Sequence, residues 1–218
     1  MKFKILYDNR AKPGFESGWG FSCLLEKEGE KIIFDTGWDG RVLTKNMERF
    51  GDSPENIEKV VISHSHWDHS GGLSAIRNKN LEVYVPLSFG NHIEGESSSR
   101  FKLIKVKDPQ KITNGVWTTG ELKNKEEEQA LVVETKNGLF ILVGCSHPGV
   151  DKIVEAASNF GKVIGIIGGL HKSTDYDVLE KMEKIVCSHC TAHKKEILKR
   201  FPEAYMDGEV GLELELEG

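Results

Sequence analysis

Residues 60–72 read Val60-Val61-Ile62-Ser63-His64-Ser65-His66-Trp67-Asp68-His69-Ser70-Gly71-Gly72, and three histidines and one aspartate fall within six of these positions. The short β-branched run at 60–62 is typical of a buried strand. His64 and His66 are two positions apart, so both side chains project to the same side of an extended backbone. Imidazole nitrogen and carboxylate oxygen are ligands that Zn²⁺, Mn²⁺ and Fe²⁺ accept. The segment therefore predicts a metal-binding loop at the end of a strand, and the alternative is a polar loop with solvated histidines.

Three further histidines each follow an apolar run in the later part of the chain. The runs are residues 139–143, 162–167 and 185–188, and the histidines are His147, His171 and His189. Open α/β sheets gather ligands at the carboxyl ends of their strands. Each of the three taken alone would be an ordinary hydrogen-bonded histidine. Because all three share the predicted position of the early cluster, we expect at least two of them to be ligands.

A two-metal site needs roughly three protein ligands per metal. The pair His64-His66 needs a third ligand, and we predict His147. The pair Asp68-His69 needs one as well, and the candidates are His171 and His189.

The remaining sequence predicts an α/β protein. Strands are expected at residues 2–7, 20–26, 31–34, 60–62, 81–85, 101–106, 111–118, 130–135, 139–143, 162–167 and 185–188, with a short strand or tail at 212–217. Helices are expected at 41–50, 73–78, 150–160, 177–184 and 193–201, and Ser53-Pro54 is a helix-start signal. The order of elements repeats from Gln129 onward. We therefore expect one domain over residues 1–218 with two similar halves, about 1–128 and 129–218.

Composition limits the classes of partner. The net charge of −5 shows no basic excess, so general nucleic-acid binding is not expected. No apolar run approaches the ~18 residues of a membrane-spanning helix, and no signal-peptide core is found, so we expect a cytoplasmic protein without a membrane partner. In that compartment the four cysteines are expected to be thiols. The spacing Cys187-x-x-Cys190 suggests half a zinc knuckle or a redox pair, but the surrounding pattern matches neither.

His64-x-His66-x-Asp68-His69 after a strand resembles the signature of the metallo-β-lactamase superfamily. The resemblance implies a four-layer αββα sandwich of two mixed β-sheets with helices outside. It also implies that the two early histidines hold one metal and the Asp-His pair a second. Asp35, at the end of the strand 31–34, resembles the first motif of the superfamily, in which an aspartate supports the metal loop without binding metal. The other interpretation of Asp35 is an N-cap for the following helix.

Residues 184–191 resemble the last metal motif of the superfamily, so the resemblance favours His189 over His171 as the ligand. His171 is then left on the open side of the site as a substrate ligand or proton donor. Superfamily members commonly carry an Asp or Cys ligand about where Cys145 stands, so Cys145 is an alternative ligand. His171 is the other alternative ligand. The segments 144–149, 168–171 and 189–191 resemble a branch of dihydropterin-ribofuranosylaminobenzene 5′-phosphate synthase-like proteins, otherwise described as metal-dependent hydrolases. That branch usually continues His-Cys-Thr-Gly, and this chain has Ala192 instead.

The resemblance implies a hydrolase with two divalent metal ions, Zn²⁺ first and Mn²⁺ or Fe²⁺ as alternatives, that uses a metal-bound hydroxide. Asp68 is expected to bind metal and to orient the hydroxide, and His171 to protonate the leaving group. A small-molecule phosphate ester or diester is the first expected substrate. The alternatives are a synthase that condenses a phosphoribosyl substrate with a pterin, a lactone or thioester hydrolase, di-iron redox chemistry, and a metal-dependent binding protein.

Substrate selection is expected to lie on the loops 8–18 and 88–100, where Arg10, Lys12 and Arg100 are candidate phosphate contacts. Trp19, Trp38 and Trp67 stand near the predicted site in sequence, and core packing explains each of them equally well. His92 is predicted to be a loop histidine. The run 126–128 is predicted to be a solvated acidic turn.

Overall fold

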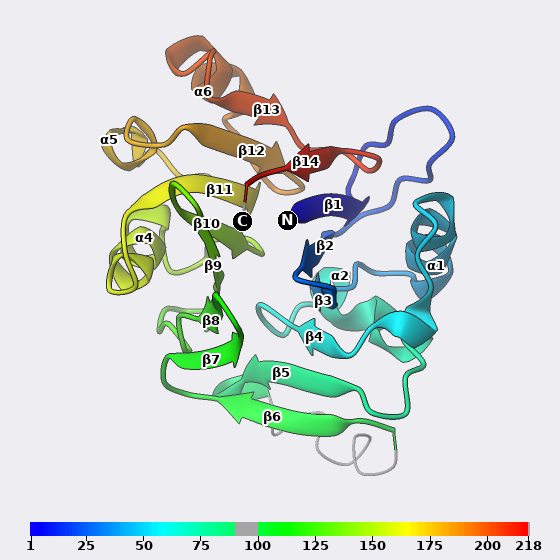
Figure 1. Ribbon diagram of the computed structural model, residues 1–218. Coiled ribbons are helices and arrows are strands. Elements are labelled where there is room, and N and C mark those ends of the chain that lie inside the picture. The colour runs from blue at the N-terminus through cyan, green and yellow to red at the C-terminus, as the bar shows by residue number, and fades with distance from the viewer. Residues whose placement is uncertain (90–99, 218) are drawn as a thin grey trace.

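The computed structural model describes residues 1–89 and 100–217, and His92 lies outside the described residues. Two seven-stranded sheets face one another (Figure 1). The first sheet has the spatial order β14 (Glu213–Glu215), β1 (Lys2–Tyr7), β2 (Ser22–Lys27), β3 (Glu30–Phe34), β4 (Lys59–Val61), β5 (Glu82–Pro86) and β6 (Lys102–Val106). The second has the order β13 (Tyr205–Asp207), β12 (Lys184–Ser188), β11 (Val163–Gly169), β10 (Gly138–Val143), β9 (Leu131–Thr135), β8 (Val116–Thr118) and β7 (Gln110–Thr113).

Helices cover the outer faces of both sheets. Helix α1 (Gly40–Arg49) lies outside the first sheet, and α4 (Val150–Ser158), α5 (Tyr176–Leu179) and α6 (Lys194–Arg200) lie outside the second (Figure 1). Three short helical turns lie before and after β4 in the chain: η1 (Pro54–Asn56), α2 (Trp67–Ser70) and η2 (Gly71–Ala75). The expected sandwich of two mixed sheets between helices is therefore confirmed.

Three apolar clusters hold these layers together. The central cluster joins the inner faces of the two sheets, for example through Phe3 and Phe140, whose ring centroids lie 6.0 Å apart. The second cluster packs the outer face of the second sheet against α4, α5 and α6, and the third packs the first sheet against α1. Buried strands alternate their side chains between two apolar environments, which explains why they read as continuous apolar runs in the sequence.

Each sheet is antiparallel in one part and parallel in the other. Strands β3 to β6 are parallel to one another, and so are β10 to β13. Parallel neighbours end at the same edge of a sheet, so the loops that follow β3, β4, β10, β11 and β12 come together. These loops carry the histidines and carboxylates identified above.

Some expected elements differ in the structure. The helix expected at 73–78 is two short turns at 67–70 and 71–75, because the chain leaves the metal motif directly in helical conformation. The helix expected at 177–184 ends at Leu179, since the amide of Glu183 already bonds to Ile164 of the neighbouring strand. The helix signal at Ser53 produces one turn without a side-chain cap. Strand β13 was not expected.

The chain ends lie side by side at the edge of the first sheet, where β14 pairs with β1 (Figure 1). Strands β7 and β8 precede residue 129 and belong to the second sheet. The division into halves at about 128/129 stays a prediction, and the sheets themselves divide the chain elsewhere. Over the described residues, no helix combines the length and apolar character that a membrane span requires.

Candidate metal centre

The loop after β4 supplies the first group of candidate ligands. The ligand atoms of His64, His66 and His147 lie within 4.8 Å of one another. The His64 ring centroid is 4.6 Å from that of His66 and 4.8 Å from that of His147. His147 comes from the loop after β10 in the opposite sheet, so the fold brings together residues separated by about eighty positions, as the strand-end argument predicts.

A second group lies beside the first. The ligand atoms of Asp68, His69 and His189 are also within 4.8 Å of one another. Nε2 of His189 is 3.2 Å from Oδ2 of Asp68. The ring centroids of His64 and His69 are only 4.2 Å apart, so the two groups adjoin. Each group offers the three ligands that one metal of a two-metal site needs.

His171 lies outside both groups. It is exposed, and its ring centroid is 5.2 Å from that of His147. Among the described residues, four groups could hold a metal; His189 belongs to two of them and His171 to none. Cys145 does belong to two of them, and its Sγ is 3.3 Å from Nε2 of His69.

Hydrogen bonds on the outer ring nitrogens orient three of the imidazoles. Oγ of Ser63 is 2.8 Å from Nδ1 of His64, and Oδ2 of Asp35 is 2.6 Å from Nδ1 of His69. Oδ1 of Asn9 is 3.0 Å from Nδ1 of His189. An outer partner of this kind fixes the tautomer and turns the other nitrogen toward the metal position. The helix α1 is capped by Asp39, so the N-cap interpretation of Asp35 is wrong.

The electrostatics of the cluster favour the neutral, ligand-competent form of His64 and His147. Burial and the neighbouring histidines hold the pKa of His64 well below 6.5. Burial, with the same kind of neighbours, lowers the pKa of His147 to about 4. For Asp68, burial acts to raise the pKa, but the hydrogen bond from His189 and the charge of His69 outweigh it and the pKa is lowered. A carboxylate among imidazoles is a donor set that divalent metals accept.

One buried atom indicates a missing partner. Nε2 of His147 is buried and has no hydrogen-bond partner among the described residues. A buried polar group without a partner costs free energy, typically about 1–3 kcal/mol. A cation coordinated by that nitrogen would remove the cost, so the residues present fit a metal.

Strained backbone marks the same loops. Asp35, Ser146, His171 and His189 all have positive φ, between 44° and 59°. This left-handed region is unfavourable for residues other than glycine and persists only where surrounding contacts enforce it. At His189 the enforcing contact is a 2.6 Å hydrogen bond from its amide to Oδ2 of Asp8, a fully buried carboxylate.

Glu128 is a supporting residue that the sequence did not reveal. The run 126–128 was expected to be solvated, but Glu128 is fully buried. Its Oε1 accepts hydrogen bonds from the amides of residues 144, 145 and 146, each 3.0 Å long, and Oε2 accepts one of 2.8 Å from His147. One carboxylate therefore shapes the whole loop after β10. Nothing in the local sequence distinguishes it from its two acidic neighbours.

Asp8 and Asn9 form a similar support below His189. They begin the loop expected to overhang the site, and the structure places them under the backbone of the last metal motif. Arg10 on the same loop pairs with Asp207, and Arg100 donates to the carbonyl of Ser74 at 2.9 Å. These two expected phosphate contacts are thus engaged with the protein itself.

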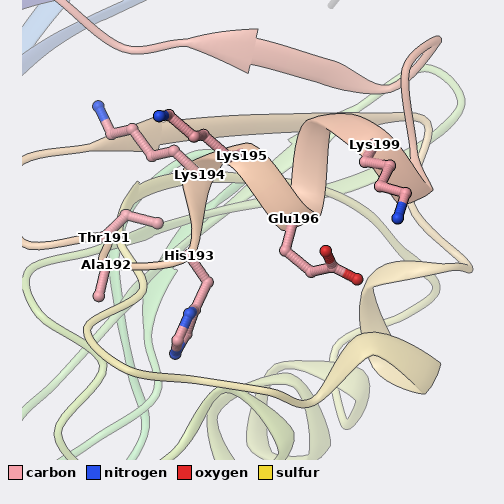
Figure 2. A pocket seen from close by; sticks show the side chains of 7 residues that line it. All are labelled: Thr191, Ala192, His193, Lys194, Lys195, Glu196 and Lys199. Carbon is pink, nitrogen blue, oxygen red and sulfur yellow. The ribbon is translucent and has the colours of Figure 1, made fainter.

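A surface pocket of about 530 Å³ lies at the start of α6, lined by residues 191–196 and Lys199. Figure 2 shows Lys194 and Lys195 on the opposite side of the helix from His193 and Glu196. The lysines therefore do not converge on one anion. No lining residue belongs to the two ligand groups, so this described pocket is separate from the candidate metal centre.

Comparisons with known proteins agree with this geometry. The synthase named 7,8-dihydropterin-6-methyl-4-(beta-D-ribofuranosyl)-aminobenzene-5'-phosphate synthase, from Methanocaldococcus jannaschii, is 28% identical over 247 residues, with 84% of each chain covered. This similarity confirms the branch resemblance of the strand-end motifs. The crystal structure of Tm1679, a metal-dependent hydrolase of the beta-lactamase superfamily, is similar over 100% of both chains, with 26% identity and a TM-score of 0.78.

The metallo-beta-lactamase fold protein YhfI from Bacillus subtilis shares the fold, with a TM-score of 0.75 at 13% identity over 98% of this chain and 99% of its own. A family model for the metallo-beta-lactamase superfamily matches residues 20–149, which is more than half of the chain. Those residues include the His64–His69 motif and His147. The chain therefore belongs to the metallo-beta-lactamase superfamily.

Proposed function

We propose that this protein is a dinuclear metal-dependent hydrolase that acts on a small phosphate ester or diester. The proposed ligands are His64, His66 and His147 for one metal, and Asp68, His69 and His189 for the other. The observation that carries the proposal is the pairing of these two groups, one of which contains the unpartnered buried Nε2 of His147.

Two bound divalent cations would lower the pKa of a coordinated water to near neutrality and polarise the bond under attack. The chain supplies the rest of the chemistry. The lowered pKa of Asp68 keeps its carboxylate ionised, so the carboxylate can accept a hydrogen bond from the O–H group of the attacking water. We propose that His171, which is exposed and has its ring centroid 5.2 Å from that of His147, donates a proton to the leaving group.

Zinc is the first proposed metal, because the ligands are five imidazoles and one carboxylate with a thiol nearby. Metal analysis of protein purified without chelator is expected to give one to two equivalents. The phosphodiester probe bis-p-nitrophenyl phosphate is expected to be cleaved, and the cleavage to stop when a chelator is added and to return with zinc.

His64→Ala is the decisive variant, with His193→Ala as its matched control. His193 lies in the separate pocket at α6 and belongs to neither ligand group (Figure 2). His64→Ala should lose metal and activity, whereas His193→Ala should keep both. Full activity without metal, or equal metal content in His64→Ala and the wild type, would refute the proposal.

A second candidate is the synthase reaction, which the name of the archaeal relative suggests. The structural support is an exposed indole, that of Trp19, beside the second ligand group. Trp19, Trp38 and Trp67 are 58–74% exposed, so core packing does not explain them. The ring of Trp19 lies 5.1 Å from that of His189 in an edge-on arrangement. Exposed indoles at a metal centre suit a substrate with a planar ring.

Titration with a pterin, followed through tryptophan fluorescence, separates the two candidates. Pterin binding that is lost in Trp19→Ala but kept in Trp117→Phe would favour the synthase reaction. Trp117→Phe is the control, because Trp117 packs against Phe160 and not against a proposed metal ligand. Absence of pterin binding together with metal-dependent phosphodiester cleavage would favour the hydrolase.

A further inference from the structure

Two cysteines from different loops place their sulfur atoms together. Cys145 follows β10 and Cys190 follows β12, with β11 between these strands. Both sulfurs lie within 4.8 Å of each other and of a ring nitrogen of His189. The Sγ of Cys190 is also 3.9 Å from the carbonyl oxygen of Cys145. Both are free thiols.

Gly169, at the end of the intervening strand, makes this approach possible. A Cβ atom at that position would lie 2.6 Å from Sγ of Cys190 and 3.4 Å from Cα of Cys145. Any side chain there would displace the Cys190 sulfur. The glycine thus leaves the space in which the two thiols meet.

The other two cysteines have different surroundings. Cys187 lies in β12 within the apolar cluster that packs against the outer helices, and Cys23 lies in the cluster between the sheets. The sequence spacing Cys187-x-x-Cys190 suggested a local pair. The tertiary structure instead gives Cys190 a partner forty-five positions away.

We propose that Cys145 and Cys190 are a redox-sensitive pair, and that their oxidation to a disulfide weakens metal binding at the adjoining ligand group. Hydrogen peroxide is the proposed oxidant. Cys190 is the more exposed of the two and reacts first: its sulfur attacks one peroxide oxygen, the O–O bond breaks, and sulfenic acid and one water form. The Cys145 sulfur then attacks the Cys190 sulfur and a second water leaves. Two thiols are oxidised, and one peroxide is reduced to two waters.

The consequence for metal binding rests on the proposed function. Sγ of Cys145 lies 3.3 Å from Nε2 of His69, a proposed ligand. A disulfide requires the sulfurs to be about 2.05 Å apart, so closure draws the two sulfurs together and pulls on the loop that carries His189 as well as on the loop that carries His147. Oxidised protein should therefore hold metal less tightly than reduced protein.

Peptide mapping of the full-length protein tests the disulfide. Reduced protein is treated with peroxide, its remaining thiols are alkylated under denaturing conditions, and the unreduced peptides are identified by mass. We expect a single linked pair that contains Cys145 and Cys190, with Cys23 and Cys187 alkylated, and reversal by dithiothreitol. A Cys187–Cys190 link, or alkylation of all four cysteines, would overturn the proposal.

Matched variants and a zinc measurement complete the test. Cys187→Ser should still form the link, whereas Cys190→Ser should not. Zinc retained on gel filtration should fall at least several-fold on oxidation of the wild type, recover with dithiothreitol, and stay constant in Cys190→Ser. A linked protein that keeps all its zinc would also overturn the proposal. Peptide mapping detects the disulfide without reference to metal. Reduced protein that binds no zinc would therefore count against the proposed function and not against the disulfide.

Discussion

Oδ2 of Asp35 lies 2.6 Å from Nδ1 of His69, and both side chains are completely buried. The same carboxylate accepts hydrogen bonds of 2.7 Å from the amide and the hydroxyl of Ser63. Burial acts to lower the pKa of His69, but the Asp35 charge outweighs it and the pKa is raised. One residue at the end of β3 therefore orients a ring in the second ligand group and also the segment that leads into the first.

The variant Asp35→Asn is expected to weaken zinc binding about 10- to 100-fold, because the loss of the charge makes His69 a poorer ligand and loosens its orientation. Competition against a fluorescent zinc chelator measures the change. Asp39→Asn, which alters the cap of α1, is the control and should bind zinc like the wild type. Unchanged affinity in Asp35→Asn would show that the contact does not serve the metal.

His189 and His171 are expected to behave differently. His189→Ala should remove about one equivalent of metal, since it takes away one of three ligands of the second group. His171→Ala should keep the metal and lower the rate by roughly 10²- to 10⁴-fold, the usual range for loss of a general acid. Metal content and turnover of bis-p-nitrophenyl phosphate are measured on the same preparations. If His171→Ala loses metal and His189→Ala keeps it, the assignment is reversed.

Glu128→Ala is expected to destabilise the fold by at least about 3 kcal/mol, because it leaves four amide donors, three of them buried, without their acceptor. Urea denaturation in the presence of a chelator gives the free energy of unfolding without a metal contribution. Glu127→Ala, at the neighbouring half-buried position, should change it by less than about 0.5 kcal/mol. Similar effects from the two variants would contradict the supporting role of Glu128.

Asp52 should give the protein a pH-dependent stability remote from the metal centre. Its Oδ2 is 2.8 Å from Nζ of Lys4, and Lys31 contacts its other oxygen. Burial acts to raise the pKa of Asp52, but the two ammonium groups outweigh it and lower the pKa below 3.8. Because the folded pKa lies below the unfolded one, the stabilisation is present above the unfolded pKa and is lost as the pH falls through the folded pKa.

Asp52→Asn is therefore expected to cost roughly 2–4 kcal/mol at neutral pH, and the difference from the wild type should shrink below about pH 4. Urea denaturation of both proteins at several pH values measures it. The exposed Asp108→Asn is the control and should follow the wild type at every pH. A difference that does not change with pH would exclude the ion pair as its cause.

Much of the fold could be predicted because its signals are local. The buried strands contain apolar β-branched runs, as in Val60-Val61-Ile62, and α1 shows helical spacing that ends at a glycine. The prediction of a helix at 177–184 was wrong for a physical reason. The segment after Leu179 has helical propensity, but pairing of β12 with β11 takes its backbone hydrogen bonds. Tertiary contacts override local propensity wherever the two compete.

The position of each histidine relative to a strand end was legible in the sequence, since parallel strands end at a common edge and their following residues must meet there. The residues that hold those histidine-bearing loops by hydrogen bonds could not be predicted from the sequence. Glu128 looks like its solvated neighbours, and Asp8 and Asn9 look like any loop residues, because burial is a property of what packs against them. Sequence patterns thus predicted an α/β protein and the candidate ligand residues, and the family resemblance predicted the sandwich. Only the folded chain decided that His189 joins Asp68 while His171 stays outside, that Cys190 meets Cys145, and that Glu128 is buried, because each depends on contacts between segments far apart in the chain.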